Sequence, residues 1–183
     1  MQRELVDRAK RGDEEAFDAL ARLVGDRCMG IASWILRDAD LAEDAVQAAL
    51  VRAWRELPTL RDADRFEAWL HRILTNECYA ESRRRTRWSA KIRLLPIHDS
   101  SDTGGILTVN DRDQLEHAFR RLTLEHRSVL VFHHVLGLPL PELAGRLGIP
   151  LGTAKSRLRL ATAALRASLD ADDRTTTTEE RFA

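Results

Sequence analysis

Apolar residues recur at spacings of three and four along most of this 183-residue chain, and no stretch alternates apolar and polar residues as a half-buried strand does. Phe17, Leu20 and Val24, followed by Cys28 and Ile31, show this spacing most clearly. Such a stripe forms one face of an amphipathic helix. The sequence therefore predicts an all-α protein.

Start and stop signals divide the helical pattern into segments. Asp13 is suited to cap the second helix, and Pro58 ends the third because the residue before proline avoids helical geometry. Asp62 or Asp64 can cap the fourth. Most of the four tryptophans are expected in the core of the bundle that these helices form. Helices are predicted over residues 2–11, 14–37, 41–57, 65–85, 114–122 and 125–136.

Residues 96–113 interrupt the helical pattern with a cluster of Pro, Gly, Ser, Asp, Asn and Thr, which predicts a linker. It separates a first domain (1–95) from a second (114–170), each near the small end of what can bury an independent core. Residues 171–183 include four consecutive threonines and are predicted to form a disordered tail. The expected architecture is two small helical domains joined by a flexible linker.

The second domain is predicted to end in a helix-turn-helix, with a short helix (141–147) and a longer one (152–169) around a tight turn at residues 148–150. The outward side of the longer helix carries Lys155 and Arg159. A basic helix of this kind suits the major groove of DNA, whose base edges present hydrogen-bond acceptors. A corner between two helices with a solvated basic face is the alternative interpretation.

Charge is segregated along the chain although the net charge is zero. Residues 83–93 hold six basic side chains and no acidic one, and residues 114–170 hold eight basic and four acidic ones. The C-terminal end of a helix is stabilised by nearby cations, which accounts for one or two of these side chains. Six exceed that number, so the run indicates either neutralisation of phosphates or a solvated charge run. Trp88 lies inside the basic run, where an aromatic residue either stacks on a base or closes the end of the bundle.

Acidic residues gather at the start of the third predicted helix, at Asp38, Asp40, Glu43 and Asp44. Carboxylates near a helix start stabilise the helix through its dipole. Their density, with Gln47 one turn further on, is also typical of a face for a basic protein partner. Both interpretations stay open on the residue pattern alone.

Several protein classes are disfavoured. Cys28 and Cys78 lie outside any Cys-x-x-Cys pair, so neither a disulfide framework nor a zinc site is expected. The longest uncharged stretch, residues 128–141, is shorter than the roughly 20 apolar residues of a membrane span. His133 and His134 lie in an apolar helix outside any catalytic motif. We therefore expect a protein that is not an enzyme, needs no cofactor or metal, and, given its charged N-terminus, is cytoplasmic.

Three motifs, in this order, resemble the extracytoplasmic-function (ECF) sigma factors of bacterial RNA polymerase over about residues 1–170. They are AEDAVQ at 42–47 with VRAW at 51–54, FEAWLHRILTN at 66–76, and GTAKSRL at 152–158. The resemblance implies sigma region two in the first domain and sigma region four in the second. It implies a protein that binds core polymerase, recognises the −35 and −10 promoter elements and promotes DNA melting.

The resemblance also implies roles for individual residues. Asn76 stands where similar proteins help to hold a flipped non-template base, a step that lowers the cost of opening the duplex. The implied polymerase-binding residues are Glu43, Asp44, Gln47 and Arg52. The implied −10 DNA-binding residues are Trp69, Asn76, Arg83, Arg84, Arg85, Arg87 and Trp88. The implied −35 DNA-binding residues are Thr153, Lys155, Ser156, Arg157 and Arg159.

Two departures from the family pattern are visible. Residues 48–50 are Ala-Ala-Leu where an acidic residue and an aromatic are common, and Leu160 and Thr162 stand where basic residues are common. The expected partners are bacterial core RNA polymerase, promoter DNA and an anti-sigma factor. The alternative function is a helix-turn-helix regulator that binds operator DNA by itself, as a dimer spanning two half-sites.

Overall fold

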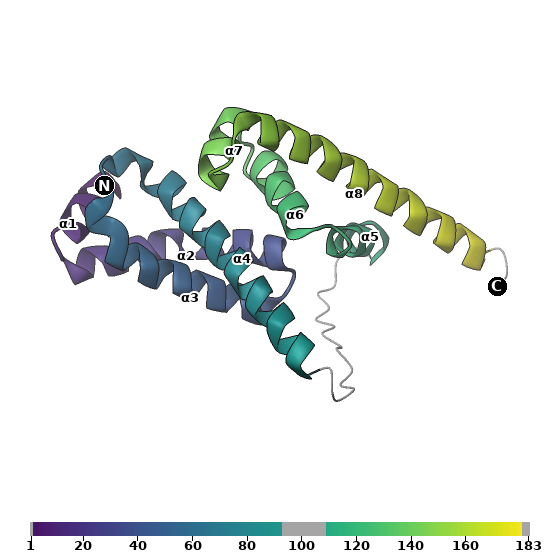
Figure 1. The fold of residues 1–183 in the computed structure, drawn as a ribbon, viewed down its shortest axis with the longest axis horizontal. Coiled ribbons are helices and arrows are strands. Elements are labelled where there is room, and N and C mark those ends of the chain that lie inside the picture. Colours follow the sequence, from purple (N-terminus) through teal and green to yellow (C-terminus); the bar gives the residue numbers. More distant parts are fainter. Residues whose placement is uncertain (1, 93–108, 181–183) are drawn as a thin grey trace. The chain divides into compact units, whose positions relative to one another are not determined.

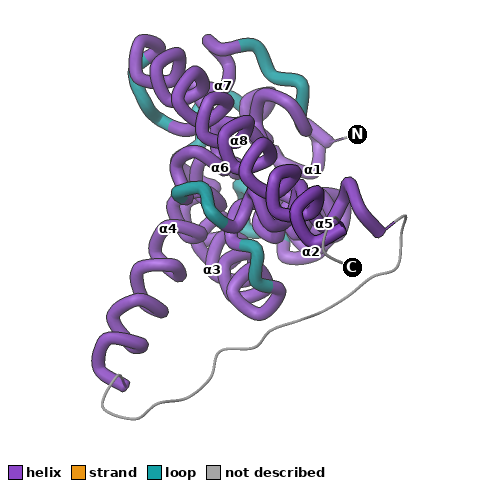
Figure 2. The backbone as a smooth tube through the Cα atoms, turned by 90° about the vertical axis from the view of Figure 1, so that its right-hand side faces the viewer, coloured by secondary structure: helices purple, strands orange, loops and turns teal. Residues whose placement is uncertain are grey.

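The computed structural model describes residues 2–92 and 109–180, and every secondary-structure element in these ranges is helical (Figure 2). The first range holds α1 (Gln2–Ala9), α2 (Glu14–Leu36), α3 (Ala39–Glu56), the 3-10 turns η1 (Leu57–Thr59) and η2 (Ala63–Arg65), and α4 (Phe66–Ile92). The second holds α5 (Val109–Arg120), α6 (Leu124–Leu130), a π-helical turn (Val131–Val135), α7 (Leu140–Leu147) and α8 (Leu151–Glu180). The prediction of an all-α protein is confirmed.

In the first part, α2, α3 and α4 pack against one another and α1 packs on α2 (Figure 1). The buried side of α3 is built from small residues, because Ala42, Ala45, Ala49 and Ala53 are all buried. Small side chains let the neighbouring helices approach closely, and larger ones from α2 and α4 complete the core. These include Leu20, Ile31, Ile35, Phe66, Leu70, Leu74 and Cys78.

Two aspartates begin the long helices of this part. The Asp13 side chain accepts a hydrogen bond from the Ala16 amide at 3.0 Å, as the sequence predicts for α2. The Asp38 side chain accepts one from the Leu41 amide at 3.0 Å, so α3 begins at Ala39 rather than at residue 41. The acidic cluster at residues 38–44 therefore includes an N-cap.

Helix α4 is longer than predicted. It continues to Ile92, whereas the sequence predicts an end near residue 85, because residues 66–92 contain neither glycine nor proline to stop it. The basic run at residues 83–87 consequently lies inside a helix and not after its end. Helical periodicity, rather than chain order, decides which of these side chains point the same way.

The tryptophans do not form the core, so that prediction is wrong. Trp34, Trp54 and Trp69 are half-buried, and Trp88 is 68% exposed. Close packing through the alanines of α3 leaves no interior space for indole rings, which lie at the edges of the bundle instead. Trp54 packs there against Phe17, with 5.0 Å between ring centroids.

In the second part, α5 and α6 both pack against α8. Helix α5 begins five residues before its predicted start, and the predicted linker otherwise lies outside the described residues, as do residues 181–183. Gly137 and Gly148, each with φ of +66°, end the two elements before α7 and α8. Helix α8 runs to Glu180 through residues 171–180, where the sequence predicts disorder, because no glycine or proline follows Gly152 to stop it.

No helix within the described ranges is both long and apolar enough to cross a membrane.

Candidate functional site

One face of α4 carries a row of polar side chains that ends in the basic run. Arg72, Asn76, Arg83 and Arg87 are exposed, and their spacings of four, seven and four place them on one side of the helix. Trp69, half-buried against Phe66 with ring centroids 6.1 Å apart, continues the row toward the helix start. We call Trp69, Arg72, Asn76, Arg83 and Arg87 the α4 stripe. Arg72 is absent from the sequence-predicted set, although its spacing from Asn76 could have indicated it.

The remaining residues of the basic run face a different direction. Arg85 pairs with the Asp38 carboxylate at the start of α3, and Arg84 pairs with Glu81 at 2.7 Å. Among the described residues, neither Arg83 nor Arg87 has an ion-pair partner. The structure thus separates four arginines of one run, Arg83, Arg84, Arg85 and Arg87, that the sequence predicts to act together.

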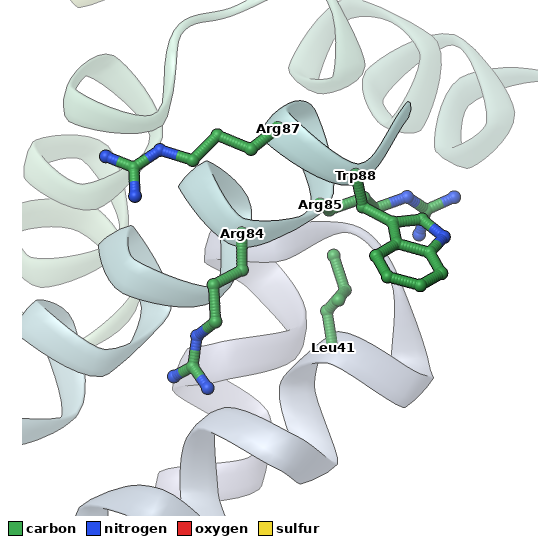
Figure 3. A pocket seen from close by; sticks show the side chains of 5 residues that line it. All are labelled: Leu41, Arg84, Arg85, Arg87 and Trp88. Carbon is green, nitrogen blue, oxygen red and sulfur yellow. The ribbon is translucent and has the colours of Figure 1, made fainter. Parts of the chain in front are cut away.

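A hollow of about 390 Å³ opens where α4 passes the first turn of α3 (Figure 3). Figure 3 shows the Trp88 ring beside Leu41, with Arg84 and Arg87 extending from α4 away from that ring. We call it the Trp88 hollow, and its lining residues are Leu41, Arg84, Arg85, Arg87 and Trp88. An apolar surface among guanidinium groups can accept a ligand that is flat and anionic.

The acidic face of α3 is only partly as predicted. Glu43, Asp44 and Gln47 are exposed, and the Gln47 amide donates a hydrogen bond to Glu43 at 3.2 Å. Arg52 lies elsewhere on the helix, where it donates to Glu56 at 2.8 Å and to Glu77 of α4 at 3.1 Å. These two hydrogen bonds raise the pKa of Arg52. The structure therefore groups three of the four predicted residues and shows the fourth tying α3 to α4.

The helix-turn-helix forms as predicted. Helices α7 and α8 follow one another across a tight turn at Gly148, and Ala154 and Ala161 of α8 are buried. Helices α5 and α6 pack against one side of α8 and leave its opposite side outward.

That outward side of α8 carries most of the predicted −35 residues. Lys155, Ser156 and Arg159 are exposed, whereas Thr153 and Arg157 are half-buried. The Ser156 hydroxyl donates to the Thr153 carbonyl at 3.0 Å, within the helix. The cationic groups presented outward by this half of the helix are therefore Lys155 and Arg159, and Leu160 beside them is 48% exposed.

No group of three or more His, Cys, Asp or Glu side chains in the described ranges could hold a metal ion. The rings of His133 and His134 meet edge to face at 4.7 Å, and the His133 Nδ1 atom lies 2.9 Å from the Leu138 carbonyl oxygen. His133 thus helps to close the turn before α7. The fold and these faces define a helical nucleic-acid-binding protein with two separate cationic surfaces.

Comparison with known proteins identifies the class more closely. The Sigma-70 region 2 family matches residues 19–88, and the Sigma-70 region 4 family matches residues 112–165. The ECF RNA polymerase sigma factor SigM of Mycobacterium tuberculosis is 31% identical over 169 residues, which cover 88% of this chain and 81% of SigM. The ECF RNA polymerase sigma-E factor of Escherichia coli is 25% identical over 166 residues, or 84% of this chain and 86% of sigma-E.

Solved structures agree with this result. CnrH, in complex with the cytosolic domain of CnrY, is 28% identical with a TM-score of 0.65, and the match covers 93% of this chain and 98% of CnrH. The sigma factor RpoE of Bartonella quintana, in complex with the anti-sigma factor NepR, is 26% identical with a TM-score of 0.69, covering 85% of this chain and 98% of RpoE. The chain belongs to the ECF sigma factors of RNA polymerase, proteins of promoter recognition and transcription initiation, and the resemblance seen in its sequence is confirmed.

Proposed function

We propose that this sigma factor binds core RNA polymerase through the exposed face of α3, reads the −10 element with the α4 stripe and reads the −35 element with α8. The observation that carries this proposal is the α4 stripe, because it places Asn76 in one row with Arg83 and Arg87. Arginines on one helix face can follow a phosphate backbone while an amide beside them bonds a base edge.

In this proposal the protein catalyses no covalent reaction during promoter opening. Extruding a base from duplex DNA costs a few kcal/mol, and a protein that binds the extruded base offsets that cost. The protein acts by binding alone, as a non-enzymatic subunit without cofactor. It works in the cytoplasm, where its polymerase and promoters are.

Two protein partners are part of the proposal. Glu43, Asp44 and Gln47 form an acidic, exposed face on α3 that suits a basic surface of core polymerase. CnrH and RpoE were each solved with a bound protein, which for RpoE is an anti-sigma factor. We infer that an anti-sigma factor likewise holds this chain inactive.

Run-off transcription tests the function. Core polymerase with and without the full chain is supplied with total genomic DNA of the organism that encodes it. We expect discrete new start sites that share upstream sequence. An absence of new transcripts from active polymerase, together with tight operator binding by the chain alone, contradicts the proposal and indicates a stand-alone regulator.

Single substitutions then test the proposed DNA-binding faces of α4 and α8. Asn76→Ala is expected to reduce opening of the identified promoter, measured by permanganate reactivity of unpaired thymines, by about tenfold. Lys155→Ala is expected to weaken closed-complex binding instead. Arg11→Ala, an exposed arginine between α1 and α2, is the matched control and should change neither measurement. Equal effects of Asn76→Ala and Arg11→Ala would remove Asn76 from the site.

A further inference from the structure

One large apolar side chain lies on the outward side of α8. Lys155, Ser156 and Arg159 are exposed on this side. Leu160 follows Ser156 by four residues, about one helical turn, so the two side chains share the same face of the helix. Leu160 is 48% exposed. The outward side therefore presents a branched apolar group beside cations and a hydroxyl.

The core of the second part does not require this leucine. The packed side of α8 is marked by Ala154 and Ala161, which are both fully buried. Leu160 is the residue before Ala161, and one residue of an α-helix turns the side chain by more than a quarter of a circle. A single exposed leucine is ordinary on a protein surface. Its place on the face that the proposed function sets against base pairs is what gives Leu160 a role.

The chemistry of the major groove selects the base that a leucine can contact. Base edges there present hydrogen-bond donors and acceptors, and thymine alone adds an apolar group, its C5 methyl. A leucine placed over the donors and acceptors displaces their water without replacing the hydrogen bonds, which is unfavourable. Packing against the thymine methyl removes apolar surface of both partners from water, which is favourable.

We propose that Leu160 selects a thymine in the −35 element by packing against its C5 methyl group. The proposal rests on the proposed function and adds an apolar contact to the polar contacts of α8. Cβ atoms one helical turn apart are about 5–6 Å from each other, and successive base pairs are about 3.4 Å apart. The selected thymine therefore lies within two base pairs of the pair that Ser156 faces.

Deoxyuridine scanning tests the contact, because deoxyuridine lacks only the C5 methyl group and pairs with adenine as thymidine does. Each thymine in the −35 element of the promoter identified by run-off transcription is replaced in turn. Binding of each probe by the reconstituted holoenzyme is then measured. We expect one replacement to weaken binding by about fourfold, the size expected for one buried methyl group.

Three variants assign that effect to the leucine. Leu160→Ala should bind the thymidine and deoxyuridine probes equally, whereas Leu160→Met keeps an apolar side chain and should retain most of the difference. Leu151→Ala is the matched control, because Leu151 is 51% exposed on the same helix. It precedes Leu160 by two and a half helical turns and so points the opposite way. It should retain the full fourfold difference.

Several results would overturn the proposal. They are a −35 element without thymine, a scan in which no replacement weakens binding, and a loss of core polymerase binding by Leu160→Ala. An equal response of wild type and Leu160→Ala to deoxyuridine would also overturn it, since the methyl group then acts through the shape of the DNA. The proposed function fails differently, because holoenzyme binding is then insensitive both to the −35 sequence and to Lys155→Ala.

Discussion

At the scale of single residues, Asp38 serves two helices with one carboxylate. One oxygen accepts the Leu41 amide and so caps α3, and the other pairs with Arg85 of α4. The ion pair with Arg85 joins positions 47 residues apart in the chain. Asp38 therefore holds the end of α4 against the start of α3, and the Trp88 hollow depends on this contact.

Asp38→Ala is expected to destabilise the protein by about 1–2 kcal/mol, because it removes an N-cap and leaves Arg85 without its carboxylate. Asp38→Asn, which retains the capping oxygen, should cost less. Urea unfolding followed by circular dichroism measures both. Equal stability of wild type and Asp38→Ala would show that the contact does not hold the two helices together.

The two cysteines give a prediction about pH. Burial raises the pKa of Cys28 to about 11 and that of Cys78 to about 12, from an ordinary value of 9.0. Above pH 9 the unfolded chain releases these protons while the folded chain keeps them. The free energy of unfolding should therefore fall as the pH rises from about 9 toward 11.

Urea unfolding at pH 8 and pH 10 tests this, with the double variant Cys28→Ala and Cys78→Ala as the comparison. The variant should lose less stability between the two pH values than wild type. Both thiols should also resist the thiol reagent DTNB at pH 8 until the chain is unfolded. Rapid labelling of the folded protein would contradict their burial.

At the scale of elements, α4 is one helix with two functional sides. Its 27 residues contribute the buried Phe66, Leu70 and Leu74 on one side and the α4 stripe on the other. The basic run is distributed between these sides because helical neighbours lie three and four residues apart. Composition alone does not distinguish the four arginines of the basic run. Their positions along the helix place Arg83 and Arg87 on the side of the stripe, and Arg84 and Arg85 on the side of the core.

Replacing Arg83 and Arg87 together with alanine should lower the slope of log affinity against log salt by about 2, because each phosphate contact contributes about 0.9. Filter binding of the holoenzyme to promoter DNA between 50 and 200 mM salt, concentrations that span a steep part of this dependence, measures the slope. The paired replacement of Arg11 and Arg22, two exposed arginines away from the stripe, is the control. An unchanged slope would exclude phosphate contacts from the stripe.

At the scale of the whole molecule, the first part and the second part each have a buried core and each present a cationic helix face. The zero net charge conceals this, because acidic residues concentrate in the first 82 positions. A sigma factor with two separate contacts gains affinity from holding both at once when core polymerase positions them. Neither face needs to bind tightly alone.

Arg83→Ala in α4 and Arg159→Ala in α8 are therefore expected to act independently. Their effects on the free energy of holoenzyme binding to the promoter should add within about 0.5 kcal/mol, as for independent sites that share no partner. A double-mutant cycle with the full chain measures this. A large coupling between the substitutions would show that the two faces bind a shared feature.

The sequence by itself determined the helical class, the helix-turn-helix, the Asp13 cap and the family, because 3.6-residue periodicity, caps and motifs are encoded locally. Only the tertiary structure decided that Arg52 and Arg85 have intramolecular partners, that no tryptophan joins the core, and that Trp88 faces an open hollow. The two arginine contacts join side chains that lie 25 and 47 residues apart in the chain. The spacing of residues within one helix determines which way each side chain points. The neighbouring helices determine whether that side chain is buried in the core, paired with a partner or exposed to solvent.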